Sequence, residues 1–253
     1  MSEDAGTGVS GSDCERINMF QFYQKNKVYF AIIWIVAYCV IIGSIRGSYG
    51  DDHPFMCLSL ATFAAVILYF VLHNRLQNKF GLNHWPKDTK RYLYFLPMWI
   101  LSTGNLWAGF NLNYKGIHQL YAMITMALVG FVEEMIFRCF LFDGMKEEGK
   151  LSIAIIISSL TFGMGHIVNL FTGQDVVQTL VQICFAVAWG FIFTMVYHKC
   201  GSILPCIIGH SLIDVFSTLA NDSALIDQIY VISTIVLSIL YCIYLSKLKT
   251  EKE

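Results

Sequence analysis

The stretch VGFVEEMIFRCF, residues 129–140, places three charged side chains inside an otherwise apolar helical pattern: Glu133, Glu134 and Arg138. Residues four apart lie on one face of an α-helix, so Glu134 and Arg138 can pair with each other. Glu133 is turned about 100° away from its neighbour. This spacing predicts that the arginine holds one carboxylate while the other points into a cavity.

Two later apolar stretches carry polar residues at the same spacing: LTFGMGHIVN (160–169) and IIGHSLIDVF (207–216). In the first, Phe162 and His166 share a helical face, and Asn169 follows a turn later. In the second, His210 and Asp214 share a face. Each of the three stretches therefore presents one polar stripe.

The composition is that of a membrane protein. The chain of 253 residues is 56% hydrophobic and 14% charged, and its mean hydropathy is +0.57; soluble domains have about 25% charged residues. At about 20 residues per span, the length predicts an all-α polytopic membrane protein with eight transmembrane helices. The apolar runs lie at 28–45, 55–72, 92–110, 117–142, 151–171, 176–197, 202–220 and 225–245.

The basic residues orient these eight runs. If the N-terminus is cytoplasmic, fourteen Lys and Arg residues fall on the cytoplasmic side and two, Arg46 and Lys115, fall on the other. This bias predicts cytoplasmic N- and C-termini. We expect residues 1–24 to form a disordered cytoplasmic tail and residues 25–250 to form a single membrane domain.

The short loops favour a multi-pass protein of a bacterial cytoplasmic membrane. A net charge of −1 gives no general attraction to nucleic acid, so the expected surroundings are the lipid bilayer and a membrane-associated partner.

Ionisable side chains within a bilayer cost several kcal/mol and mark functional sites. Under the predicted topology Glu133, His166, His210 and Asp214 all come near mid-membrane. Hydrolysis needs an activated water and a group that stabilises an oxyanion, and these residue types can supply both. From the residues alone, a catalytic site, an ion or proton path and a structural network all stay open.

The residues also leave open whether the site binds a metal ion. One glutamate and two histidines form a plausible zinc set, and Asp214 could join Glu133, His166 and His210 as ligands. The helical motif HExxH is absent, so a cofactor, if one is used, is a divalent metal such as zinc without a compact sequence signature.

The three stretches resemble the motifs of the CAAX-protease and bacteriocin-processing family of intramembrane proteases, also called CPBP or Abi. That pattern is EExxxR, then FxxxH, then HxxxN or HxxxD, and the resemblance covers roughly residues 117–220. It implies an eight-helix membrane endopeptidase in which Glu133 activates the water and His166 helps to position it. It also implies that His210 and residue 214 stabilise the oxyanion, while Glu134 and Arg138 hold the helices in register.

One position departs from the commoner pattern, because residue 214 is Asp where Asn is frequent. An ionised Asp cannot donate a hydrogen bond to an oxyanion, whereas a protonated one can. Asp214 could instead orient His210 or bind a metal. Phe162 and Asn169 are expected to support the site.

The function expected from the resemblance is hydrolysis of a peptide bond in a membrane-associated or lipidated substrate. The alternative is a non-proteolytic scaffold or bacteriocin immunity protein that binds a peptide or a sensor kinase. Ion or proton transport is a third class, but the chain has no internal repeat of the kind that marks many transporters.

Overall fold

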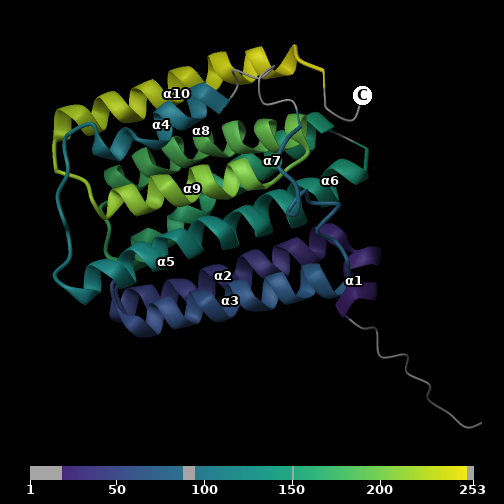
Figure 1. Cartoon of the computed structure of the whole chain (residues 1–253), viewed down its shortest axis with the longest axis horizontal. Coiled ribbons are helices and arrows are strands. Elements are labelled where there is room, and N and C mark those ends of the chain that lie inside the picture. The colour runs from purple at the N-terminus through teal and green to yellow at the C-terminus, as the bar shows by residue number, and fades with distance from the viewer. Residues whose placement is uncertain (1–18, 88–94, 150, 250–253) are drawn as a thin grey trace, which may run out of the picture.

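The computed structural model describes residues 19–87, 95–149 and 151–249, and their regular structure is helical apart from an isolated bridge between Phe110 and Ala220 (Figure 1). The α-helices are α1 (Met19–Lys25), α2 (Lys27–Tyr49), α3 (Pro54–His73), α4 (Phe95–Ser102), α5 (Ile117–Glu134), α6 (Asp143–Glu147), α7 (Leu151–Met164), α8 (Val176–Cys200), α9 (Leu204–Ser217) and α10 (Ala224–Ser246). Two short 3₁₀ helices, η1 (Gly104–Leu106) and η3 (Gly165–Thr172), and a π-helix, η2 (Met135–Phe142), complete the described segments.

Six helical segments in the described part of the chain are long and apolar enough to cross a membrane. They are α2, α3, the continuous rod Ile117–Glu147, Leu151–Phe171, α8 and α10. The chain is therefore a polytopic, all-α membrane protein, as its composition predicts.

The other two predicted runs form helices that are shorter than a usual span. Helix α9 has 14 residues, and α4 has 8. Helix α4 ends where the polar residues of the third run begin: Ser102 donates to the Met98 carbonyl, and Gly104 starts η1. Residues 92–94 of that run lie outside the described residues.

Helix α1 corrects part of the predicted tail. Residues 1–18 lie outside the described residues, but Met19–Lys25 are helical rather than disordered. Tyr23 is 2% exposed, and its ring lies 5.2 Å from that of Phe30 and 5.6 Å from that of Phe70. Burying one large aromatic side chain contributes about 1.5–3 kcal/mol to stability. The burial of Tyr23 therefore orders a segment that the polar N-terminal sequence predicts to be part of a disordered tail.

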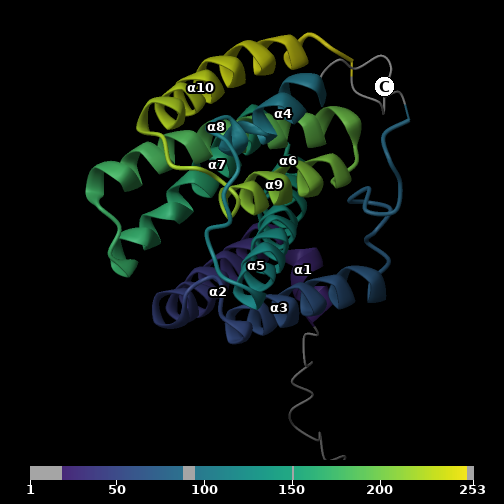
Figure 2. The same ribbon diagram turned by 60° about the vertical axis from the view of Figure 1, so that its left-hand side comes forward.

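The helices pack as a bundle around α5 and α9, which contact each other along their length. Helices α2 and α3 form a hairpin on one side of this pair, and α10 lies on the far side with α4 (Figures 1 and 2). Helices α7 and α8 form a second hairpin, and α8 packs on α10.

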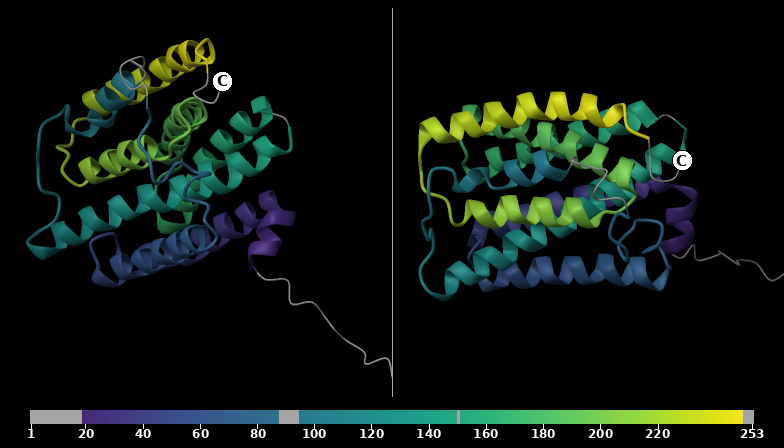
Figure 3. Two further views of the ribbon diagram at one scale, coloured as in Figure 1. Left: turned by 45° about the vertical axis from the view of Figure 1, so that its right-hand side comes forward. Right: turned by 45° about the horizontal axis from the view of Figure 1, so that its top comes forward.

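The connections gather at two ends of the bundle (Figure 3). One end holds the α2–α3, η1–α5, η3–α8 and α9–α10 connections, and the other holds α1 and the α3–α4, α6–α7 and α8–α9 connections. The helices in the described part of the chain thus make eight passages between the two ends, with α4–η1 and α9 as the short ones. We call the end that holds α1 the basic end, because nine described basic residues lie there: Lys25, Lys27, Arg75, Lys79, Lys87, Lys146, Lys199, Lys247 and Lys249.

Ion pairs connect helices at the basic end. The Lys79 ammonium lies 3.1 Å from a carboxylate oxygen of Asp143 and 2.9 Å from one of Glu147, and it donates to the Tyr23 hydroxyl. Lys27 also pairs with Glu147. Burial disfavours the charged form of Lys79, but Asp143 and the two hydrogen bonds outweigh this effect, so the pKa of Lys79 is raised above its ordinary value.

Candidate active site

The two glutamates of the first motif are the last residues of α5, directly before the π-helix η2. All eight residues of η2 are buried, including Arg138. π-helical turns interrupt the α-helical hydrogen-bond pattern and occur frequently at functional sites. The helix therefore changes its winding just after the position where Glu133 and Glu134 must point in different directions.

Glu134 is fully buried between two cationic or hydrogen-donating partners. One of its oxygens lies 3.2 Å from Nη1 of Arg138 and 2.9 Å from Nδ1 of His210. A carboxylate only accepts hydrogen bonds, so Nδ1 of His210 donates to it. This contact links α5 to α9 and fixes the orientation of the imidazole ring.

The buried positive charge of Arg138 is stabilised by aromatic ring faces as well as by Glu134. Its contact with Glu134 lacks hydrogen-bond geometry, and its guanidinium nitrogens have no hydrogen-bond partner among the described residues. The guanidinium carbon lies 4.2 Å from the ring centre of Phe162 and 5.5 Å from that of Phe193. Such cation–π contacts are worth about 2 kcal/mol or more when desolvated. Phe162 therefore supports the buried charge as well as the histidine of its own motif.

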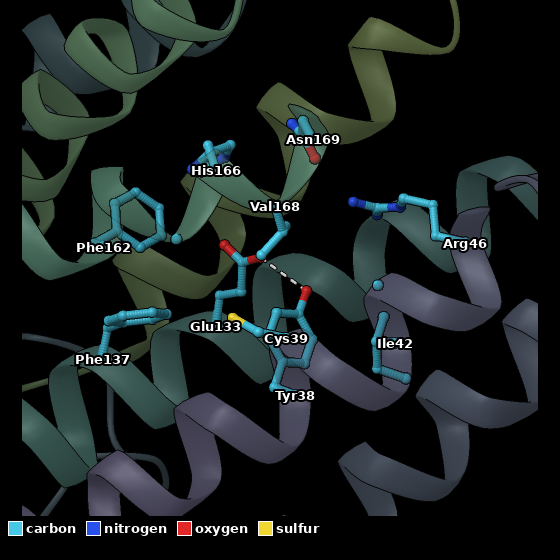
Figure 4. A pocket seen from close by; sticks show the side chains of 12 residues that line it. Tyr38, Cys39, Ile42, Arg46, Glu133, Phe137, Phe162, His166, Val168 and Asn169 are labelled. Atoms are coloured by element: carbon cyan, nitrogen blue, oxygen red, sulfur yellow. Dashed lines mark hydrogen bonds between the residues drawn. The ribbon is translucent and has the colours of Figure 1, made fainter. Parts of the chain in front are cut away.

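Glu133 points the other way, into open space (Figure 4). Its side chain is 12% exposed, and one oxygen accepts a hydrogen bond of 2.8 Å from the Tyr38 hydroxyl. The other oxygen lies 3.8 Å from Nε2 of His210. The two adjacent carboxylates are thus divided as the sequence predicts, one held in the core and one facing a cavity.

His210 lies between the carboxylates of three residues. While Nδ1 contacts Glu134, Nε2 is 3.4 Å from a carboxylate oxygen of Asp214, one turn further along α9. The imidazole stacks on Phe193 at a centroid distance of 5.5 Å and meets the edge of Phe162 at 5.5 Å. These rings restrict the imidazole, so Nε2 keeps its orientation toward Glu133 and Asp214.

His166 is the second residue of η3, where the chain tightens from α-helical to 3₁₀ winding. Its ring meets that of Phe162 edge-on at 5.8 Å. Its buried Nδ1 atom has no hydrogen-bond partner in the part of the chain that the structure describes. Three residues later, the Asn169 amide donates to the Gln182 side chain at 2.8 Å and so ties η3 to α8.

The four ionisable residues of the prediction line one cavity. Its volume is about 710 Å³, and its walls include Glu133, His166, His210 and Asp214. A smaller chamber of about 50 Å³ lies beside it, between α2 and η3, and shares Glu133, His166 and Asn169 with it. Figure 4 shows this chamber from close by.

Two residues at this site were not predicted. Tyr38 holds Glu133, and Arg46 lines both spaces while its Nε donates to Asp51 at 2.7 Å. Both come from α2, outside the three motifs. A signal was present, because Tyr38, Ile42 and Arg46 recur at intervals of four and form one face of the helix.

The arrangement of donors does not fit a metal site. Among residues 19–87, 95–149 and 151–249, no group of three or more His, Cys, Asp or Glu side chains could hold a metal ion. The chemistry that these residues themselves can carry out is proton transfer by a carboxylate next to oriented imidazoles.

Comparison with known proteins agrees with the motifs. Residues 116–216 match the family described as Type II CAAX prenyl endopeptidase Rce1-like. This region is a domain of that family, which is a family of proteases, and the resemblance read from the three motifs is confirmed. The matched region contains all three motifs but not α2. No curated protein and no solved structure matches the chain.

Proposed function

We propose that this multi-pass membrane protein, which carries a Rce1-like CAAX endopeptidase domain, is an intramembrane endopeptidase that uses a glutamate-activated water. The observation that carries the proposal is the convergence of Glu133, His166, His210 and Asp214 on one cavity of about 710 Å³. The substrate is a membrane-associated or lipidated peptide or protein, because the scissile bond must reach a cavity inside the bundle.

In this mechanism Glu133 acts as the general base. A water molecule in the cavity gives a proton to the free oxygen of Glu133, and its own oxygen attacks the carbonyl carbon of the scissile bond. The proton then passes to the leaving nitrogen as the C–N bond breaks. General acid–base catalysis of this kind contributes about 10²–10⁴-fold to a rate.

The neighbouring residues position the water and stabilise the intermediate. His166, across the cavity from Glu133, orients the water. Nε2 of His210, when it carries a proton, donates to the oxyanion, and a protonated Asp214 adds a second donor. Glu134 and Arg138 form the buried support, since their contacts hold His210 and Phe162 in place.

The proposal includes the orientation of the chain. All eight passages cross the bilayer, with α4–η1 and α9 as short crossings inside the bundle, and both termini are cytoplasmic. The concentration of basic residues at one end supports this orientation. The membrane is a bacterial cytoplasmic membrane.

The test is substitution of the proposed base. Cells or proteoliposomes that carry Glu133→Gln, which keeps the size of the side chain, should lose processing of membrane peptides that the native protein cleaves. Glu148→Gln is the matched control, because Glu148 is an exposed carboxylate at the basic end. Comparison of membrane peptides from the two strains by mass spectrometry identifies the substrate.

The same kind of substitution tests the alternative, in which the protein is a non-proteolytic scaffold or immunity protein. If Glu133→Gln and His166→Ala both fold and both retain the biological activity, hydrolysis is refuted. A scaffold or bacteriocin immunity protein would then be the better description, with the buried polar residues serving helix packing.

A further inference from the structure

The mouth of the cavity lies at the end of the bundle opposite the basic end. Several residues that line it lie in or next to the connections at that end: Gly50, Asp51, Asp52, Tyr114, Gln174 and Ser217. The first three belong to the α2–α3 connection, and Ser217 is the last residue of α9. Burial, together with the carboxylates of Asp51 and Asp52, raises the pKa of Tyr114 at this mouth.

A side groove opens at the same end. It lies between α2 and η3, has a volume of about 650 Å³ and is lined by Gly47, Ser48 and the highly exposed Phe171. It shares Cys39 and Val168 with the small chamber next to Glu133. Both openings therefore lie beside the C-terminal part of α2, since Gly47 lines each of them.

Between Glu133 and the basic end lies a cluster of packed aromatic side chains. Phe140 follows Glu133 along the same rod and is fully buried. Its ring centre lies 6.3 Å from that of Tyr23, 5.2 Å from that of Phe30, and 6.0 Å from those of Phe70 and Phe80. No residue from the connections at the basic end lines the cavity in the described part of the chain.

The distribution of basic residues identifies the two sides of the membrane. Nine of the described basic residues lie at the basic end, whereas Arg46 and Lys115 lie at the other. Short loops rich in Lys and Arg stay in the cytoplasm. The end that carries the mouth is therefore the non-cytoplasmic one.

We propose that the site receives its substrate from the non-cytoplasmic side of the membrane, so that its substrates are exported peptides or the outward-facing segments of membrane proteins. This inference rests on the proposed function and narrows its substrate class. A peptide tail presented in the cytoplasm would meet the aromatic layer around Phe140 rather than the cavity.

The test is the accessibility of single introduced cysteines to a membrane-impermeant maleimide. Ser217→Cys places a thiol at the mouth, and Ser246→Cys places one at the basic end, where Ser246 is the last residue of α10. Both serines are exposed. Labelling is scored above that of the unsubstituted chain, whose native cysteines provide the baseline.

We expect Ser217→Cys to react in intact cells and Ser246→Cys to react only after the membrane is permeabilised. Ser48→Cys, at the side groove, repeats the measurement if Ser217→Cys does not fold, and Lys249→Cys does the same for the basic end. Reaction of the mouth cysteines only after permeabilisation, or in neither state, overturns the inference.

This experiment is independent of catalysis. A mouth that faces the cytoplasm would overturn the access side and leave the proposed hydrolysis standing. Full processing by Glu133→Gln would refute hydrolysis whichever side the mouth faces.

Discussion

Replacing Gly130 with alanine should disturb the site although Gly130 contacts no substrate. Gly130 lies on α5 where α9 approaches most closely, and a Cβ atom built there would lie 2.6 Å from the backbone nitrogen and 2.6 Å from the hydroxyl of Ser211. Ordinary contacts of a Cβ atom begin at 3.4 Å. Helix α9 must therefore move by about 0.8 Å, which is the difference between these two distances.

Two effects of this substitution oppose each other. Alanine in a helix is favoured over glycine by about 1 kcal/mol, whereas overpacking a well-filled contact costs about 1–3 kcal/mol. Ser211 cannot simply turn aside, because its hydroxyl donates to the Ala127 carbonyl on α5. We expect the clash to prevail, with a net loss of stability of up to about 2 kcal/mol.

The displacement reaches the site through α9. A shift of α9 away from α5 would weaken the hydrogen bond of 2.9 Å between Glu134 and His210, because these two residues lie on the two helices that must separate. Misplacement by about 1 Å can cost 10²-fold in rate, so we expect processing by Gly130→Ala to fall by one to two orders of magnitude.

The assay is the rate of substrate processing in proteoliposomes, read beside thermal unfolding in detergent. Gly43→Ala on α2 is the matched control for stability, because a Cβ atom there meets nothing within 4 Å. Gly43 lines the small chamber, so only the unfolding temperature of this variant is compared. Native activity and stability in Gly130→Ala would show that α5 and α9 are not packed this closely, and the proposed geometry of the site would fail with it.

Three further substitutions separate the roles of neighbouring residues. Tyr38→Phe removes a hydrogen bond to the Glu133 carboxylate, worth about 1.5–3 kcal/mol of stability, so the unfolding temperature should fall by several degrees. Processing should fall as well, because Glu133 loses the partner that orients it; an unchanged rate would remove Tyr38 from the site. Arg138→Met removes the cationic partner of the buried Glu134 and leaves it only the hydrogen bond from His210; breaking a buried ion pair costs about 3–5 kcal/mol, so size-exclusion chromatography should show little folded protein, and a stable variant would contradict the buried pair. Asp214→Asn should retain activity in the processing assay because an amide can donate to an oxyanion, whereas Asp214→Leu should not; the opposite order would indicate that the carboxylate itself is required.

The sequence was informative where function depends on spacing within one helix. The pairing of Glu134 with Arg138 and the contact of His210 with Asp214 both join residues four apart, and helical geometry determines both. The convergence of the three motifs could be predicted only by assuming that their helices are neighbours. The periodicity within each helix does not indicate which helices pack together; the structure shows that α5 packs on α9.

The features that were missed depend on contacts between distant segments. Tyr38 is one aromatic residue in an apolar run, and only the approach of α2 to η2 gives its hydroxyl a partner 95 positions away. Helix α1 is ordered by rings on α2 and α3. The π-helix of Met135–Phe142 has no signature in an apolar sequence that suits ordinary α-helix equally well.

Because α2 supplies a wall of the cavity, the region that matches the family does not contain the whole site. A fragment cut at residue 116 would strip Glu133 of its hydroxyl donor and expose the apolar flank of η2 to lipid or detergent. Anyone who seeks a minimal version for crystallography or for transplantation into another scaffold should keep the first hairpin, or express it as a separate piece and look for complementation between the two halves.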